Sequence, residues 1–244
     1  MAASVGSAFM AKPPAVQLAP GVWRIPLIGD FVNGFMLRDD DGQVTLIDMG
    51  IAQSGKKVIA ALRSVGSDPS DVTRLMLTHC HPDHAGGAAY VAKETGRPVD
   101  VHAADAEYVR SGTQPPRDQS IRFGKLFSRF PDPKLTPVTV GEELGDGQVV
   151  PFAGGIRVIH TPGHSPGHAS YLHEESGTLI TGDAIFNVLG RRWPMKFLCT
   201  DFAMTKETAH KLGEVEYAVA AFTHGPEITD RPREAIRKFL AENR

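Results

Sequence analysis

The pattern of apolar and polar positions divides the chain into two halves with the same plan. Each half begins with short β-prone runs bounded by turn residues and then alternates strands with helical segments. Strands are expected over 22–28, 31–37, 43–47, 72–77, 99–101, 148–152, 155–160, 169–172, 178–181 and 218–222. Helices are expected over 54–65, 84–94, 103–111, 206–212 and from Pro232 onward, since proline is favoured in the first helical turn. Two β-sheets packed face to face, with helices on both outer faces, account for this order.

Two stretches depart from this plan. Residues 1–20 are rich in Ala, Pro and Ser, so we expect a flexible N-terminal arm followed by a single domain over residues 21–244. Residues 112–137 contain five prolines and three phenylalanines. Long irregular segments inside a compact domain are often lids or binding loops. The alternative is a surface excursion that buries its own aromatic side chains.

The composition is that of an ordinary globular protein, and it excludes several partners. Of the 244 residues, 41% are hydrophobic and 22% charged, which suffices for a sizeable core. The net charge of −2 gives no electrostatic basis for binding nucleic acid or an acidic membrane surface, so the expected partner is a small-molecule substrate. Two cysteines make no disulfide framework, and we find neither a signal-peptide pattern nor an apolar run of membrane-spanning length. We therefore expect a cytoplasmic location, and the oligomeric state stays open.

The segment His-Cys-His-Pro-Asp-His at residues 79–84 carries the strongest chemical signal. It lies where the predicted strand 72–77 ends and the next helix begins, which is a common place for ligands in α/β proteins. Neutral imidazole and carboxylate groups bind zinc and other divalent first-row metals. The segment therefore predicts a metal site, with a polar surface loop as the alternative.

Three further candidate ligands follow at turns or strand ends. His164 lies in the Pro- and Gly-rich run Thr-Pro-Gly-His-Ser-Pro-Gly-His, which fixes a tight loop. Asp183 follows the apolar run 178–180, and His224 follows the predicted strand 218–222. Each residue alone would be unremarkable, but together with the first cluster they become candidate ligands.

With these residues in this order, the sequence resembles the metallo-β-lactamase-fold hydrolase superfamily over nearly the whole chain from about Val22. The resemblance implies an α/β fold, an αβ/βα four-layer sandwich of two mixed β-sheets, with a dinuclear metal site at the sheet edges. It implies the following ligands: His79, His81 and His164 for one metal ion; Asp83, His84 and His224 for the other; Asp183 as the bridge between them. Nitrogen and oxygen donors favour two Zn²⁺ ions, with iron or manganese as alternatives.

The expected chemistry follows from the type of ligand. Two nearby cations can share a hydroxide formed near neutral pH, which attacks an ester, lactone or thioester carbonyl without a covalent enzyme intermediate. Asp83 is the candidate catalytic residue that handles the proton. Asp48 is a candidate supporting residue or a simple turn residue, and His168 is expected to support its loop rather than bind metal. Phe186 occupies the position at which acyl-homoserine lactonases carry a substrate-contacting tyrosine.

Differences from other branches of the superfamily leave the lactonase or glyoxalase II-like branch as the one that the sequence resembles. True β-lactamases carry Cys or Ser where this chain has Asp183, and flavodiiron proteins carry Glu where it has His81. Only twenty residues follow His224, too few for the glutathione-binding tail of glyoxalase II. Aromatic and apolar side chains at 186–199 predict a pocket wall for an apolar acyl or aryl group. The alternatives are a mononuclear iron enzyme similar to the persulfide dioxygenases and a metal-binding protein without catalysis.

Overall fold

The computed structural model describes residues 13–118, 120, 133–152 and 154–243. Its first sheet has seven strands in sequential order. These strands are β1 (Val16–Ala19), β2 (Val22–Ile28), β3 (Val32–Arg38), β4 (Val44–Ile47), β5 (Val72–Met76), β6 (Val99–His102) and β7 (Val140–Leu144). The pairs from β1 to β4 are antiparallel and those from β4 to β7 are parallel, so the sheet is mixed.

The second sheet has five strands in the order β12-β11-β10-β9-β8. They are β8 (Val149–Val150), β9 (Ile156–His160), β10 (Ala169–His173), β11 (Thr178–Ile180) and β12 (Val219–Ala221). Again the antiparallel strands come first, and the last pair, β11 with β12, is parallel. Each half of the chain thus builds antiparallel strands and then parallel strands joined by helical crossovers, as the sequence pattern predicts.

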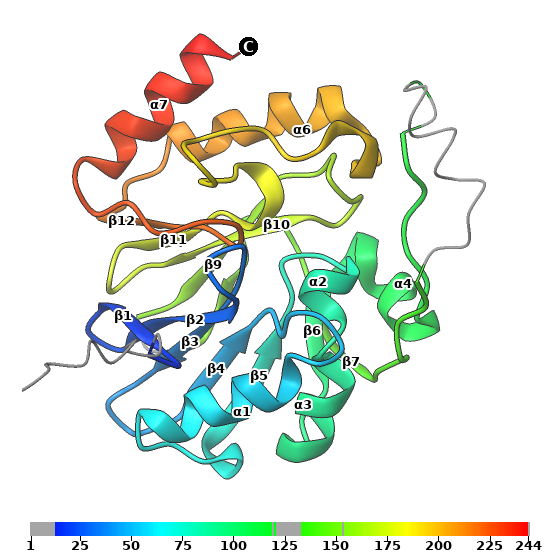
Figure 1. Ribbon diagram of the computed structural model, residues 1–244, viewed down its shortest axis with the longest axis vertical. Helices are drawn as coiled ribbons and strands as arrows, with labels where there is room; N and C mark the ends of the chain where they lie inside the picture. The colour runs from blue at the N-terminus through cyan, green and yellow to red at the C-terminus, as the bar shows by residue number, and fades with distance from the viewer. Residues whose placement is uncertain (1–12, 119, 121–132, 153, 244) are drawn as a thin grey trace, which may run out of the picture.

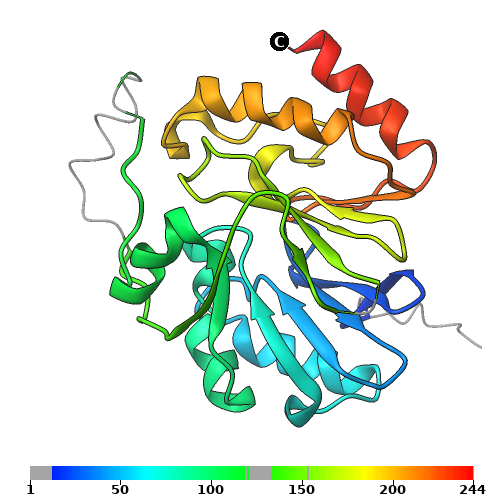
Figure 2. The same cartoon turned by 180° about the vertical axis from the view of Figure 1, so that it is seen from behind.

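Helices cover the two outer faces of the pair of sheets (Figure 1). Seen from behind, the sheets lie between the two groups of helices (Figure 2). Helices on the first sheet are α1 (Gly55–Ser64), α2 (Pro82–Ala85), α3 (Ala88–Thr95) and α4 (Ala106–Ser111), and those on the second are α6 (Phe202–Ala209) and α7 (Pro232–Glu242). The predicted α/β four-layer sandwich is confirmed.

Three apolar cores hold the four layers together. A single strand contributes to two of them, because its successive side chains point to opposite faces of the sheet. In β3, Phe35 and Leu37 face the second sheet, whereas Met36 faces the helices of the first. In β10, Tyr171 lies between the sheets, and its neighbour Leu172 packs in the core beneath α6 and α7. Successive side chains of a strand point to opposite faces, so buried strands in a four-layer fold are apolar on both faces.

The predicted N-terminal arm is wrong in part. Residues 16–19 form β1, which pairs antiparallel with β2 and places Leu18 and Ala19 against the core between the sheets. A four-residue run preceded by prolines carries a weak strand signal, and only its neighbour β2 makes it a strand. Residues 1–12 and most of 119–132, including the three phenylalanines of the proposed lid, lie outside the described residues.

The predicted helix 84–94 is divided into α2 and α3 at Gly86 and Gly87. A Cβ atom on Gly87 would lie 2.2 Å from the carbonyl oxygen of Met49, and one on Gly86 would lie 2.7 Å from the amide nitrogen of Ala52. The amide of Gly87 donates to the carbonyl of Gly50 instead of continuing a helix. The close approach of the 49–52 loop therefore breaks the helix. Among the residues described, no helix is long and apolar enough to cross a membrane.

Candidate metal centre

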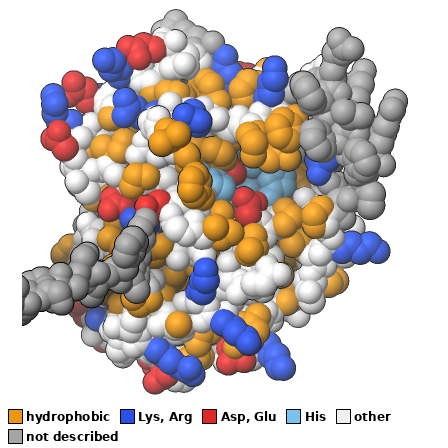
Figure 3. All heavy atoms as spheres, in the orientation of Figure 1, with side chains coloured by type: hydrophobic (Ala, Val, Ile, Leu, Met, Phe, Trp, Pro, Cys, Tyr) orange, Lys and Arg blue, Asp and Glu red, His pale blue; other side chains and the backbone are white. Residues whose placement is uncertain are grey.

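The predicted ligands meet where four strands end. Segment 79–84 follows β5, His164 follows β9, Asp183 follows β11 and His224 follows β12. Both sheets contribute, so residues separated by up to 145 positions share one edge of the sandwich. Histidine side chains are visible near the centre of this face, with hydrophobic side chains around them (Figure 3).

The first group of donors consists of three histidine nitrogens. Nδ1 of His81 lies 3.1 Å from Nε2 of His79 and 2.9 Å from Nε2 of His164. Tetrahedral zinc with bonds of about 2.0–2.1 Å holds neighbouring nitrogens about 3.3 Å apart. The three nitrogens therefore lie at a spacing that fits one metal ion, and these residues could hold one.

The second group consists of Asp83, His84 and His224. Oδ2 of Asp83 lies 3.6 Å from Nε2 of His84 and 3.4 Å from Nε2 of His224. The two imidazole nitrogens are 3.3 Å apart. This group could hold a second metal ion.

Asp183 lies between the two groups and presents one oxygen to each. Its Oδ2 is 3.1 Å from Nε2 of His164, in the first group. Its Oδ1 is 3.3 Å from Nε2 of both His84 and His224, in the second group. Oδ1 also accepts a hydrogen bond of 2.8 Å from the hydroxyl of Thr223. Each carboxylate oxygen of Asp183 thus faces one of the two groups of donors.

Asp48 determines which nitrogen faces inward in two of the histidines. Its Oδ2 accepts a hydrogen bond from Nδ1 of His84 at 2.8 Å and from the hydroxyl of Thr78 at 2.7 Å. Because the Thr78 hydroxyl donates to Asp48, its oxygen accepts from Nδ1 of His79 at 3.0 Å. When neutral, both rings therefore carry the proton on Nδ1 and the lone pair on Nε2, toward the centre. Asp48 itself has φ +58°, a left-handed conformation that Asp tolerates.

Two other histidines are oriented in the same way by different acceptors. Nδ1 of His164 lies 3.4 Å from Sγ of Cys199, whose thiol is directed at the carbonyl of Met195. Nδ1 of His224 donates to the carbonyl of Phe31, in the turn between β2 and β3. A thiol is a weaker acceptor than a carboxylate or a carbonyl, so His164 is held less firmly than His84.

His168 is not arranged as a ligand. Its Nδ1 donates to the carbonyl of Thr161 at 3.0 Å, and its Nε2 accepts the amide proton of Asp183 at 2.7 Å. Burial lowers the pKa of His168 to about 3, so the ring is neutral. Gly182 makes room for the ring, because a Cβ there would lie 2.5 Å from Nε2 of His168. His168 thus holds the backbone of Asp183 in place.

The carboxylates give the centre an environment for positive charge. Burial would lower the pKa of His164, yet the adjacent Asp183 carboxylate raises it to about 10. His224 behaves similarly, with burial overcome chiefly by Asp183 and a pKa raised to about 9. Burial opposes the charged form of Asp183, but the nearby His224 and His84 hold its pKa well below the usual range. Two ionised carboxylates among imidazole donors fit a pair of divalent cations.

Residues 27–224 match the family model described as the metallo-beta-lactamase superfamily. The chain belongs to this superfamily. It is 26% identical over 231 residues to the probable metallo-hydrolase YflN of Bacillus subtilis (strain 168), covering 88% of each chain. It is 29% identical to an N-acyl homoserine lactonase from a Bacillus species, over 69% of this chain and 62% of that one. A solved metallo-beta-lactamase family protein of Thermus thermophilus superposes with a TM-score of 0.70 at 25% identity, over 93% of this chain and 80% of that one.

In this superfamily member, an apolar pocket of about 450 Å³ is lined by Gly225, the residue that follows His224. It is lined by Phe31, whose carbonyl binds His224, and by Leu189. These two side chains are 63% and 93% exposed, unusually high for large apolar groups. The ring of Phe186 packs against that of His224 with their centres 4.3 Å apart. None of the predicted ligands lines the pocket itself, and Phe186 is an apolar side chain that packs directly on His224.

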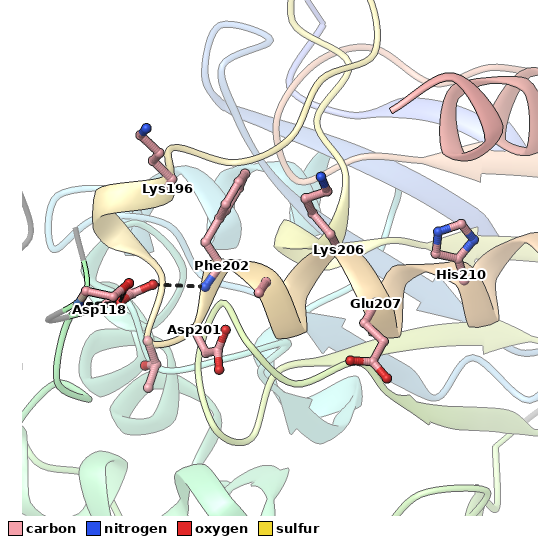
Figure 4. A pocket seen from close by; sticks show the side chains of 10 residues that line it. Asp118, Lys196, Asp201, Phe202, Lys206, Glu207 and His210 are labelled. Carbon is pink, nitrogen blue, oxygen red and sulfur yellow. Dashed lines mark hydrogen bonds between the residues drawn. The ribbon is translucent and has the colours of Figure 1, made fainter. Parts of the chain in front are cut away.

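A larger cavity of about 820 Å³ runs along α6 (Figure 4). It is lined by Lys196, Phe202, Lys206 and Glu207, among others, and by none of the predicted ligands. It lies close to the His164 loop, because the amide of Asp201 donates to the carbonyl of Gly163. The expectation that the whole segment 186–199 walls the metal pocket is therefore too broad.

Trp193 is one residue of segment 186–199 that lies away from the predicted metal pocket. Its ring packs against Phe239 of α7 with centres 4.8 Å apart, and its indole nitrogen donates to the carbonyl of Asn243. The side chain contributes to the core outside the second sheet. Among the interactions described, the contacts of segment 186–199 with predicted ligands come from its two ends: Phe186 and Asn187 contact His224, and Cys199 contacts His164.

The sequence interpretation named Asp48 and His168 as supporting residues, but it missed three others, Thr78, Thr223 and Cys199. Thr78 and Thr223 each directly precede a ligand histidine, and that repeated Thr-His pair is a signal that could have revealed them. Cys199 carries no such signal, since it lies 35 positions from the histidine it contacts.

Proposed function

We propose that this protein is a dinuclear metal-dependent hydrolase of small esters, lactones or thioesters. The observation that carries the proposal is the placement of Asp183, whose two oxygens face two separate groups of three donors. A mononuclear iron enzyme would not require the second group, yet Asp83, His84 and His224 are all present within 3.6 Å of one another.

The fit of the residues to two cations supports zinc as the metal. All seven donors are nitrogen or oxygen atoms. The distances between neighbouring donor atoms are close to those expected around a tetrahedral zinc ion. When bound, the cations would lower the pKa of a shared water molecule and polarise the carbonyl oxygen of the substrate.

The chain supplies the remaining tasks. Asp83 is suited to proton transfer, because its side chain is 37% exposed whereas that of Asp183 is 4% exposed. Burial opposes the charged form of Asp83, but the charge of His84 and a hydrogen bond with His224 hold its pKa well below the usual range, so the side chain is ionised at neutral pH. Phe31 and Leu189 offer apolar surface for the acyl part of the substrate. The lactonase among the relatives supports the same class of substrate.

The test combines metal quantification with a panel of lactones, esters and thioesters on the same preparation. We expect two metal ions per chain and hydrolysis of at least one class. Asp183→Ala should retain at most one ion and lose more than about 100-fold in kcat/KM. Asp230→Ala, which removes an exposed carboxylate paired with Arg231, is the matched control and should behave as wild type.

Three results would contradict the proposal. Two ions retained by Asp183→Ala would rule out the bridge. One iron per chain with oxygen consumption would favour the dioxygenase alternative. A fully metal-loaded protein that hydrolyses nothing on the panel would favour a binding protein without catalysis.

A further inference from the structure

Asp105 connects the two loops that carry the first group of donors. It follows β6 and lies at the start of α4, fully buried. Its Oδ2 accepts hydrogen bonds from the hydroxyl of Ser165 at 2.6 Å and from the amide of Cys80 at 3.3 Å. Its Oδ1 accepts a hydrogen bond from the amide of Gly167 at 2.6 Å. One carboxylate therefore binds donors from two loops that are about 85 positions apart in sequence.

The bonded residues are immediate neighbours of the donors. Cys80 lies between His79 and His81, and Ser165 directly follows His164. A displacement of either loop relative to Asp105 would therefore change the distances of 2.9 and 3.1 Å among the three inward nitrogens. Asp105 itself is not among the groups that could hold a metal ion.

The second loop packs closely against Asp105. A Cβ atom on Gly167 would lie 2.5 Å from the amide nitrogen of Asp105 and 2.8 Å from its Cγ. The loop backbone thus rests directly on the carboxylate. Three hydrogen bonds and this contact define a fixed distance between the loops.

We propose that Asp105 is a positioning residue for the first metal site: it sets the separation of the two loops and thereby the affinity of His79, His81 and His164 for a metal ion. The inference rests on the proposed metal centre. Residues that orient ligands without touching the metal commonly change metal affinity by about 10–100-fold when they are replaced.

The test uses Asp105→Asn with Asp100→Asn as the matched control. Asparagine keeps the size of the side chain but places an amide or a single oxygen where the carboxylate accepts from three donors. Asp100 is another buried carboxylate of β6, where it accepts from the amide of Glu142 and pairs with Arg74, away from both loops. Zinc titrations with a competing chelator should show one site weakened about 10–100-fold in Asp105→Asn, the other unchanged, and both unchanged in Asp100→Asn.

A measurement on the metal-free protein tests the hydrogen bonds of Asp105 to the two loops separately from metal binding. Hydrogen exchange at the amides of Cys80 and Gly167 should be faster in Asp105→Asn than in wild type and unaffected in Asp100→Asn. Cobalt substitution gives a spectroscopic check, because the absorption of the weakened site should change while that of the other site is retained. Wild-type zinc affinity at both sites in Asp105→Asn would overturn the proposal.

Ser165→Ala keeps the proposal testable if Asp105→Asn does not fold. This variant removes one of the three hydrogen bonds, and we expect a several-fold loss of affinity at the same site. Unchanged affinity in Ser165→Ala, with Asp105→Asn unfolded, would also overturn the proposal. A wild-type protein that binds no metal would refute the proposed function instead, and the amide exchange would still report on the connection.

Discussion

Side chains behind the predicted ligands decide which ring nitrogen faces the centre, and Asp48 serves two rings at once. In Asp48→Asn, the single amide oxygen cannot replace both carboxylate oxygens, because one accepts from the Thr78 amide and the other from the Thr78 hydroxyl and His84. The positive φ of this position suits Asn as well as Asp, so the fold should be retained. We expect the metal affinity to fall about 10–100-fold, as measured by titration against a chelator. Wild-type affinity in this variant would show that the ring orientation is fixed by other contacts.

A second residue-scale prediction concerns acid stability. Burial, with a smaller effect of the stacked His160 ring, lowers the pKa of His102 to about 4. The unfolded chain, with a pKa near 6.5, binds the proton more tightly, so stability is lost as the pH falls from about 6.5 toward 4. Allowing for partial exposure to solvent, we expect His102 to account for roughly 1 kcal/mol of the loss between pH 7 and pH 5.

Urea unfolding at the two pH values measures this contribution. His102→Asn is the comparison, because asparagine can still accept from the amide of Ala104, as Nδ1 of His102 does. The variant should lose less stability than wild type over this range. An equal loss in both proteins would assign the acid sensitivity to other groups.

The parts of the site that can be predicted are those with a local sequence pattern. The cluster at 79–84 is recognised by the spacing of its His and Asp residues, and the loop around His164 by its Pro and Gly content. Asp105 and Cys199 could not be predicted, because an acid at a helix start resembles an ordinary cap and a lone cysteine resembles a packed core residue. Their partners lie 60 and 35 positions away, and only the packing of the two sheets brings them together.

At the scale of elements, β1 offers a direct test of its place in the fold. Leu18 packs against the core between the sheets, while the adjacent Gln17 is exposed. We expect Leu18→Asp to lower the free energy of unfolding by about 1–3 kcal/mol, because it places a charge against apolar surface. Gln17→Asp, on the opposite face of the same strand, should change it by less than about 0.5 kcal/mol. Equal effects of the two variants in urea unfolding would contradict the packing of β1.

Elements with a strong periodic pattern were predicted well, and those that depend on neighbours were not. The range of β2 matches its prediction, and α7 begins at Pro232 as predicted. β7 was not predicted, because residues 140–144 include a glycine and two exposed glutamates and resemble a loop. It is a strand because it pairs in parallel with β6 at the edge of the sheet. Helix α6 begins at Phe202, four residues before its predicted start, where Asp201 caps it.

At the scale of the whole molecule, metal ions at the proposed centre would join the two sheets, since each group takes donors from both. A ligand that binds only the folded state at 1,000 times its Kd adds about 4 kcal/mol. For a chain of this size, 1 kcal/mol corresponds to about 2–4 °C in Tm. We therefore expect chelation to lower Tm by at least about 8 °C in scanning calorimetry, and excess zinc to restore it. A Tm that is insensitive to chelator would contradict a metal contribution to folding stability.

The order of the donors along the chain also has a consequence for biosynthesis. The loop with the first four candidate ligands emerges from the ribosome early, but His224 follows 140 positions after His84. A nascent chain could thus assemble its first group of donors well before the second is complete. Any product of premature termination before residue 224 would lack the last donor, so a complete pair of cations would mark a polypeptide synthesised through both sheets.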